Sequence, residues 1–128
     1  MTFVLFTDNL ADLTISEALV QSRQAGFSGL DLTVRPGGHV LPDNVDRGLA
    51  EAKRLADGQD MTIPMISTAI TDADSPHAEA IFAAAAHYGV QRVKLGYWDY
   101  QPFGTLSKQL DFARAALGRV ITLARKYH

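Results

Sequence analysis

Two short stretches of this sequence hold side chains that could bind a hydroxylated or anionic ligand. The first begins at Arg35 and contains a proline, two glycines and His39. Arginine can fork onto a carboxylate or phosphate, glycine lets the backbone approach a ligand closely, and histidine can polarise a carbonyl, act as an acid or bind a metal. The structural alternative is a Pro-Gly turn with a histidine bonded to backbone. We expect Arg35 and Gly38 to bind substrate and His39 to be catalytic.

The second stretch begins at Lys94 and contains three aromatic side chains. A buried ammonium group needs an anionic partner, so Lys94 is either a catalytic cation or the ion-pair partner of Asp31. The rings of Tyr97, Trp98 and Tyr100 suit the wall of a sugar pocket, although they could equally plug the end of a barrel. We expect Lys94 to be catalytic and the three aromatic residues to bind substrate.

A repeated strand–helix pattern positions both stretches. Strand starts recur at about thirty residues, which is the length of one βα unit. The expected strands are residues 3–6, 30–34, 65–70 and 92–97. The expected helices begin at Thr14, near Asp43, at Ser75 and near Thr105. We therefore expect four consecutive βα units in one α/β domain that covers residues 1–128.

Local signals mark the ends and buried faces of these elements. Thr14 and Glu17 have capping-box spacing, Ser75 is followed by a proline at the first helical position, and Pro64 precedes a strand. The expected buried face of the second helix contains Val45, Leu49, Ala52 and Ala56. The expected buried face of the last helix contains Leu106, Leu110, Ala113, Leu117, Val120 and Ala124.

Two architectures fit four βα units: half of a (β/α)8 TIM barrel, and a small flavodoxin-like doubly wound sheet. Both place ligands at the carboxyl ends of the strands. Strands in the middle of an open sheet are covered on both faces and should be apolar on both. The second and fourth strands instead have one polar face, with Asp31, Thr33, Arg35, Arg92 and Lys94. We therefore expect the half-barrel, with Arg35, His39 and Lys94 on one side of the sheet at its carboxyl edge.

Composition argues against several classes of function. The chain has no Cys, which excludes disulfides and thiolate zinc sites. Its net charge is -2, from 12 basic and 14 acidic residues, which argues against binding to nucleic acid or to an anionic membrane surface. No apolar run approaches the roughly 18 residues of a membrane span, and the N-terminus lacks the positive region of a signal peptide. We expect a cytoplasmic protein.

Three segments together resemble the N-terminal half of the sugar phosphate isomerase/epimerase family, the xylose-isomerase-like TIM barrels. They are GLDLTVRPGGHVLPDNV, MISTAITDAD and VKLGYWDY, and the first is the most specific. The resemblance covers essentially the whole chain but only half of a typical member. It implies a small carbohydrate or sugar phosphate as substrate, with proton transfer between adjacent carbons. By position, the residues that match the family's pocket-lining region are Arg35, His39, Lys94 and Tyr97.

The resemblance also implies a divalent metal (Mn, Mg, Co or Zn) in the complete barrel, held mostly by Glu, Asp and His of later strands. We expect no metal ligand in this chain. The alternative function is a non-catalytic sugar-binding or assembly module. Because a half-barrel has two unpaired edges and the first strand carries no charge, we expect a homodimer that closes an eight-stranded barrel. The alternatives are domain swapping and a complementing C-terminal half-barrel.

Overall fold

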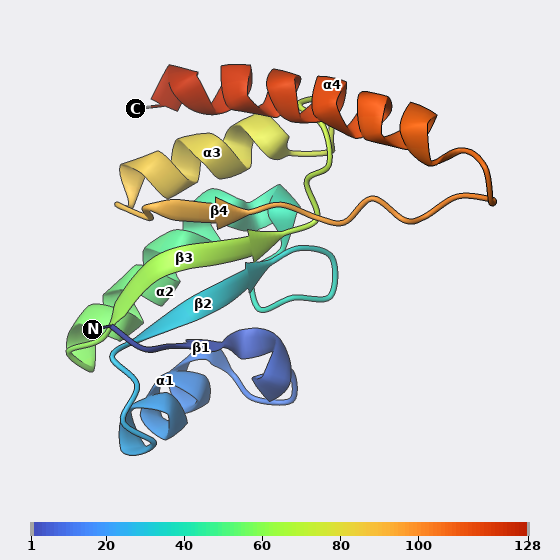
Figure 1. Cartoon of the computed structure of the whole chain (residues 1–128). Helices are drawn as coiled ribbons and strands as arrows, with labels where there is room; N and C mark the ends of the chain where they lie inside the picture. Colours follow the sequence, from blue (N-terminus) through green and yellow to red (C-terminus); the bar gives the residue numbers. More distant parts are fainter. Residues whose placement is uncertain (1, 128) are drawn as a thin grey trace.

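The computed structural model describes residues 2–127 and shows strands and helices that alternate along the chain (Figure 1). The strands are β1 (Val4–Phe6), β2 (Gly29–Val34), β3 (Thr62–Thr68) and β4 (Arg92–Lys94). The α-helices are α1 (Ile15–Gln24), α2 (Val45–Gly58), α3 (Ala78–His87) and α4 (Leu106–Ala124). Short 3-10 segments cover Thr7–Leu10, Pro42–Asn44 and Arg125–Tyr127. The expected α/β class is confirmed.

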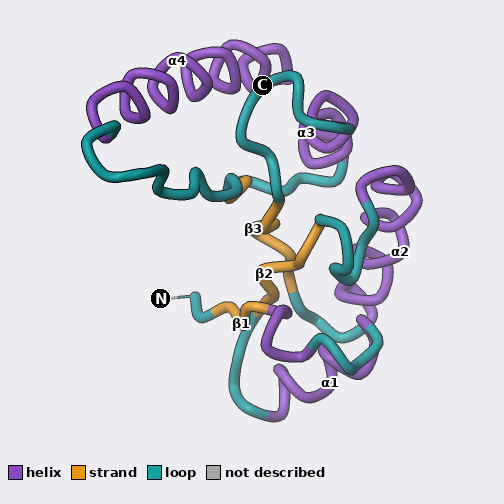
Figure 2. Tube along the Cα trace, turned by 90° about the vertical axis from the view of Figure 1, so that its right-hand side faces the viewer, coloured by secondary structure: helices purple, strands orange, loops and turns teal. Residues whose placement is uncertain are grey.

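The four strands form one parallel sheet in the order β1-β2-β3-β4. This order lacks the reversal that characterises doubly wound sheets. In Figure 2, α1, α2 and α3 lie on one side of the strands, and the loop from β4 to α4 lies on the other. The sheet therefore has one face covered by these three helices and one face that they leave open.

The strand register sets which side chains share the open face. Asp31 lies between Phe6 and Met65, and Met65 pairs with Arg92. In the next row Thr33 pairs with Ser67, and Ser67 pairs with Lys94. The opposite face carries the buried residues Leu30, Leu32, Val34 and Ile66. The polar face expected for the second and fourth strands is present.

The first two helices form as their sequences predict. The side chain of Thr14 accepts a hydrogen bond from the Glu17 amide, and the Glu17 carboxylate accepts one from the Thr14 amide at 2.8 Å. This completes the capping box. The four apolar residues expected on the inner face of α2 are buried: Val45, Leu49, Ala52 and Ala56.

Two strands differ from their expected bounds by more than one residue. β3 begins at Thr62, so Pro64 lies inside the strand rather than before it. A register shift against β2 accommodates this proline, which cannot donate to the ladder, and its carbonyl accepts from the Gln91 amide at 3.1 Å. β4 ends at Lys94, three residues early, because the Gly96 amide leaves the ladder and donates to the carbonyl of Ile70 at 2.8 Å.

The third helix begins at Ala78, and the expected cap at Ser75 is wrong. The Ser75 hydroxyl accepts instead from the amides of Thr71 and Asp72, at 3.1 and 3.0 Å, and so closes the loop after β3. The residue that precedes α3 is His77, whose φ of 63° lies in the left-handed region. Ser75 therefore stabilises a turn rather than the helix end.

The expected buried face of α4 is largely wrong. The helix buries Ala116, Val120 and Leu123, and only Val120 belongs to the expected set. The apolar stripe formed by Leu106, Leu110, Leu117 and Ile121 is 40–51% exposed. The reason is that α4 packs against α3 along one side, which leaves this stripe exposed to solvent. No helix within residues 2–127 combines the length and the apolarity needed to cross a membrane.

Candidate functional site

A cavity of about 470 Å³ lies at the carboxyl end of the sheet, between the loop after β4 and the first turns of α4. We call it the Trp98 cavity. Its aromatic lining residues are Tyr97, Trp98 and Phe112, and its polar lining residues are Thr71, Asp99, Gln101, Lys108 and Gln109. Its volume is within the range of roughly 300–1,000 Å³ found for small-ligand pockets. Aromatic rings beside hydrogen-bonding groups fit a ring that is apolar on its faces and polar at its rim.

Backbone contacts fix the walls of this cavity. Gly96 starts the loop against β3, where an added Cβ atom would lie 2.9 Å from the backbone of Ala69. Any larger residue would push the loop away from the sheet. At the other end, the side chain of Gln109 accepts a hydrogen bond from the Gln101 amide at 3.0 Å, which ties the loop to α4. The cavity is thus held by contacts at both ends of the loop.

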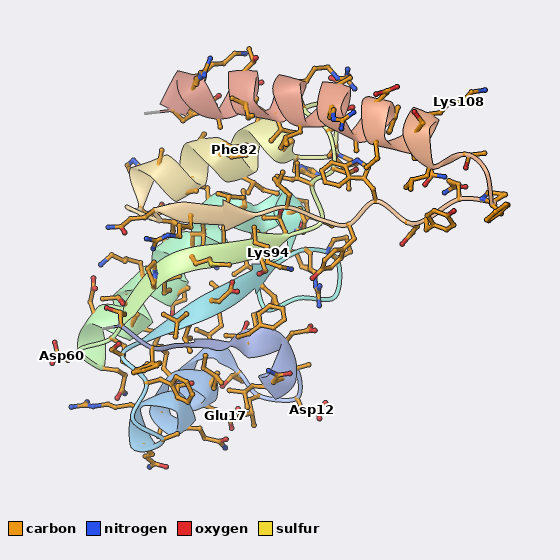
Figure 3. The ribbon with its side chains drawn as sticks, in the orientation of Figure 1. Asp12, Glu17, Asp60, Phe82, Lys94 and Lys108 are labelled. Carbon is orange, nitrogen blue, oxygen red and sulfur yellow. The ribbon has the colours of Figure 1, made fainter. Side chains whose placement is uncertain are left out.

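Lys94 projects from the open face beside this cavity (Figure 3). Its Nζ donates to the Tyr97 hydroxyl at 2.7 Å and lies 4.4 Å from the centre of the Tyr97 ring and 5.8 Å from that of Phe6. Within residues 2–127 no carboxylate oxygen lies within 4 Å of this ammonium group. The alternative of a direct ion pair with Asp31 is therefore not formed.

Asp31 is the buried carboxylate of the open face. Its side chain accepts from the Ser67 hydroxyl, with oxygen–oxygen distances of 2.9 and 3.0 Å. Burial raises the pKa of Asp31, and the Ser67 hydrogen bond and the charge of Lys94 partly oppose this increase. Asp31 thus feels the charge of Lys94 without forming a salt bridge to it.

Arg35 and Gly38 occupy structural positions. The guanidinium of Arg35 forms an ion pair with Asp8, which follows β1. A Cβ atom on Gly38 would lie 3.1 Å from the carbonyl oxygens of Thr33 and Arg35. The close approach that this glycine permits is thus to the protein's own backbone. Their predicted roles in substrate binding stay predictions.

Both ring nitrogens of His39 contact protein groups. Its Nε2 lies 3.1 Å from the Leu13 carbonyl oxygen, and since a carbonyl only accepts, Nε2 donates there. Its Nδ1 lies 3.0 Å from the Thr33 hydroxyl, which also accepts from the His39 amide. These bonds hold the loop after β2 against the loop after β1. The predicted catalytic role of His39 stays a prediction.

The structure thus brings some of the candidate residues together and separates others. Tyr97 and Trp98 line one cavity beside Lys94, whereas Tyr100 is 63% exposed and is not among its lining residues. No hydrogen bond or ion pair within the described part of the chain joins Arg35, His39 and Lys94 to one another. Sequence patterns missed the residues that α4 adds to the cavity, Lys108, Gln109 and Phe112, because their place depends on the Gln101–Gln109 contact.

The residues present do not fit a metal ion. Residues 2–127 contain no group of three or more His, Asp or Glu side chains that could hold one.

Comparison of this sequence with models of known protein families gave no match, and comparison with curated proteins found no similar sequence.

Proposed function

We propose that this chain is one half of a (β/α)8 barrel of the sugar phosphate isomerase/epimerase kind, and that the Trp98 cavity is part of its sugar pocket. The observation that supports it best is the Trp98 cavity itself, where aromatic and polar side chains meet beside an ammonium group without a carboxylate partner. Strand order and the uncovered polar face support the barrel, because in a closed barrel that face lines the interior.

Each group has a role in this proposal. The rings of Trp98 and Tyr97 pack on the apolar face of the sugar, and Asp99 and Gln109 bind its hydroxyl groups. Lys94 binds the phosphate or the oxyanion of the substrate, with Tyr97 fixing the direction of its ammonium group. In the complete barrel the reaction is proton transfer between adjacent carbons. Because the described residues do not form a metal site, no step through a metal is assigned to this chain.

Calorimetry with xylose, ribose and their 5-phosphates tests this proposal. We expect saturable binding that is tighter for the phosphates. Lys94→Met should weaken binding of the phosphates about tenfold or more, because it removes a charge-assisted hydrogen bond. The control is Lys53→Met on α2, whose ammonium group pairs with Asp57. Equal effects of the two substitutions, or no binding of any probe, would contradict the proposal.

The alternative function is a non-catalytic sugar-binding or assembly module. It is favoured by the exposed apolar stripe of α4, which suits assembly rather than catalysis. Assays of aldose–ketose interconversion with added manganese, magnesium, cobalt or zinc test the module. Robust turnover by this chain alone would exclude it, whereas binding without turnover is expected both of the module and of a half-barrel without its complement.

The proposal includes a second copy of the chain as partner. β1 and β4 are the edge strands of the sheet, and α4 exposes the stripe of Leu106, Leu110, Leu117 and Ile121. Unpaired strand edges and apolar patches of this kind favour association. In the proposed dimer β1 of each copy pairs with β4 of the other, and the α4 stripe is covered. Domain swapping and a partner polypeptide that supplies strands five to eight are the alternatives.

A further inference from the structure

A second cavity of about 470 Å³ lies at the same edge of the sheet, between the loops after β2 and β3. We call it the Ile70 cavity. The buried residues among those that line it are Val34, Ile70 and Ile81, each at most 2% exposed. Leu41, Pro36 and Pro42 add further apolar surface. The polar residues that also line it are Asp43, Thr71, Ser75 and His77, and its buried apolar residues favour an apolar group.

The two cavities have one wall in common. Thr71 lines both of them, and its amide donates to the Ser75 hydroxyl at 3.1 Å. This hydrogen bond holds the dividing loop in place. One cavity has charged and aromatic residues, and the other is mainly aliphatic, so the two differ in the chemistry that they favour.

A strained residue lies at the rim of the Ile70 cavity. His77 lines the cavity in a left-handed backbone conformation, with φ of 63°. A residue with a Cβ atom is strained in this conformation. Backbone strain of this kind persists only where the surrounding structure imposes it, and it is common at ligand sites. The position of the His77 ring is therefore obtained at a cost in folding stability.

We propose that the Trp98 cavity and the Ile70 cavity bind two parts of one ligand, a glycoside with an apolar aryl or alkyl aglycone. The inference rests on the sugar site of the proposed function, because the sugar part occupies the Trp98 cavity. A glycoside has no free carbonyl group, so it binds there without undergoing the proton transfer. The aglycone passes over Thr71, the lining residue that both cavities share, and packs on Ile70, Ile81 and Leu41, with His77 at its edge. Sequence patterns gave no indication of this cavity, since its residues come from three separate elements.

Methyl and phenyl glycosides of glucose, galactose, mannose and xylose test the inference on the full chain. Trp98 is the one tryptophan of the chain, so its fluorescence reports the sugar cavity. Methyl NMR signals of Ile70 and Ile81 report the other cavity. We expect both classes of glycoside to change Trp98 fluorescence. Only the phenyl glycosides should shift the two isoleucine signals, and they should bind about tenfold more tightly.

Two variants sharpen the test. Leu41→Ala should remove most of the preference for the phenyl group and leave methyl glycoside binding unchanged, because Leu41 is 49% exposed and contributes little to folding. Val20→Ala on α1, where Val20 is 37% exposed, is the matched control and should change neither. His77→Gly should reduce the phenyl preference and also raise the denaturation midpoint, since glycine adopts the left-handed conformation without strain.

The outcomes separate this inference from the proposed function. Equal affinity for methyl and phenyl glycosides, with unmoved isoleucine signals, would overturn the inference and leave the sugar site intact. Binding of phenol at the isoleucines without any gain from an attached sugar would show two unrelated cavities and would also overturn it. If no glycoside or sugar phosphate changes Trp98 fluorescence, the proposed function fails and the inference fails with it.

Discussion

Helices α2 and α4 both have apolar residues at helical spacing, but they bury them to very different extents. In α2 the apolar residues Val45, Leu49, Ala52 and Ala56 are at most 3% exposed. In α4 the residues Leu106, Leu110, Leu117 and Ile121 are 40–51% exposed. The difference arises from their neighbours, because α2 packs on the sheet between α1 and α3, whereas α4 packs mainly against α3. The packing around α2 therefore stabilises the fold, whereas the β4–α4 end has exposed apolar surface that a ligand or partner could contact.

The largest expected contrast is between two leucines. Leu49→Ala on α2 should reduce the free energy of unfolding by about 2–5 kcal/mol, because it leaves a cavity in the core. Leu117→Ala on α4, where Leu117 is 40% exposed, should change it by only about 0.5 kcal/mol. Urea denaturation followed by circular dichroism measures both. Similar losses would mean that α4 is packed as tightly as α2.

Glycine-to-alanine substitutions in α2 and α4 should change the free energy of unfolding by smaller amounts and in opposite directions. An added Cβ atom at Gly48 on α2 would lie 2.5 Å from Cγ1 of Val40, whereas one at Gly118 on α4 would meet no atom within 4 Å. Gly118→Ala should stabilise the protein by about 1 kcal/mol through helix propensity. Gly48→Ala has the same gain, but overpacking of about 1–3 kcal/mol opposes it, so a net loss is expected. Stabilisation by both substitutions would show that α2 has room at this position.

How far the sequence predicts the structure differs between the same two regions. The capping box of Thr14 and Glu17 and the buried face of α2 depend on residues close in sequence, and both were predicted correctly. The buried face of α4 was not, because both Leu117 and Ala116 fit a helical apolar stripe and only the neighbouring helix decides between them. For the same reason Gln109 and Phe112 were missed as cavity residues, whereas Trp98 was identified from its type and place after a strand.

The pH dependence of folding stability tests the contact that joins α4 to the loop after β3. Arg119 of α4 donates two hydrogen bonds to the carboxylate of Asp72, which lowers the pKa of Asp72 to about 2 from its usual 3.8. A lowered pKa in the folded state stabilises the protein above pH 3.8, and this contribution is lost as the pH falls through about 2. Arg119→Met should flatten the pH dependence of stability in this window, as measured by urea denaturation between pH 2 and pH 5. An unchanged slope would show that the contact does not form in solution.

Substitutions in the exposed apolar stripe of α4 should have the smallest effect on folding stability. Their main effect should be on association of two copies of the chain. Leu110→Glu should weaken the proposed dimer about tenfold or more and leave the fold intact, because it places a charge in an apolar interface. Ser107→Glu adds the same charge at an exposed position of the same helix and is the control. Light scattering at micromolar concentration decides, and a stable wild-type monomer would contradict the dimer.

A fluorescence titration of Trp98 with ribose 5-phosphate in the wild type, Lys94→Met and Lys53→Met tests the proposed sugar phosphate site at the β4–α4 end. We expect a saturable change in the wild type and in Lys53→Met, with affinity reduced about tenfold or more in Lys94→Met. Circular dichroism should show the same fold in all three. A change in Trp98 fluorescence that never saturates, or that Lys94→Met leaves untouched, would contradict the placement of a sugar phosphate site at the β4–α4 end.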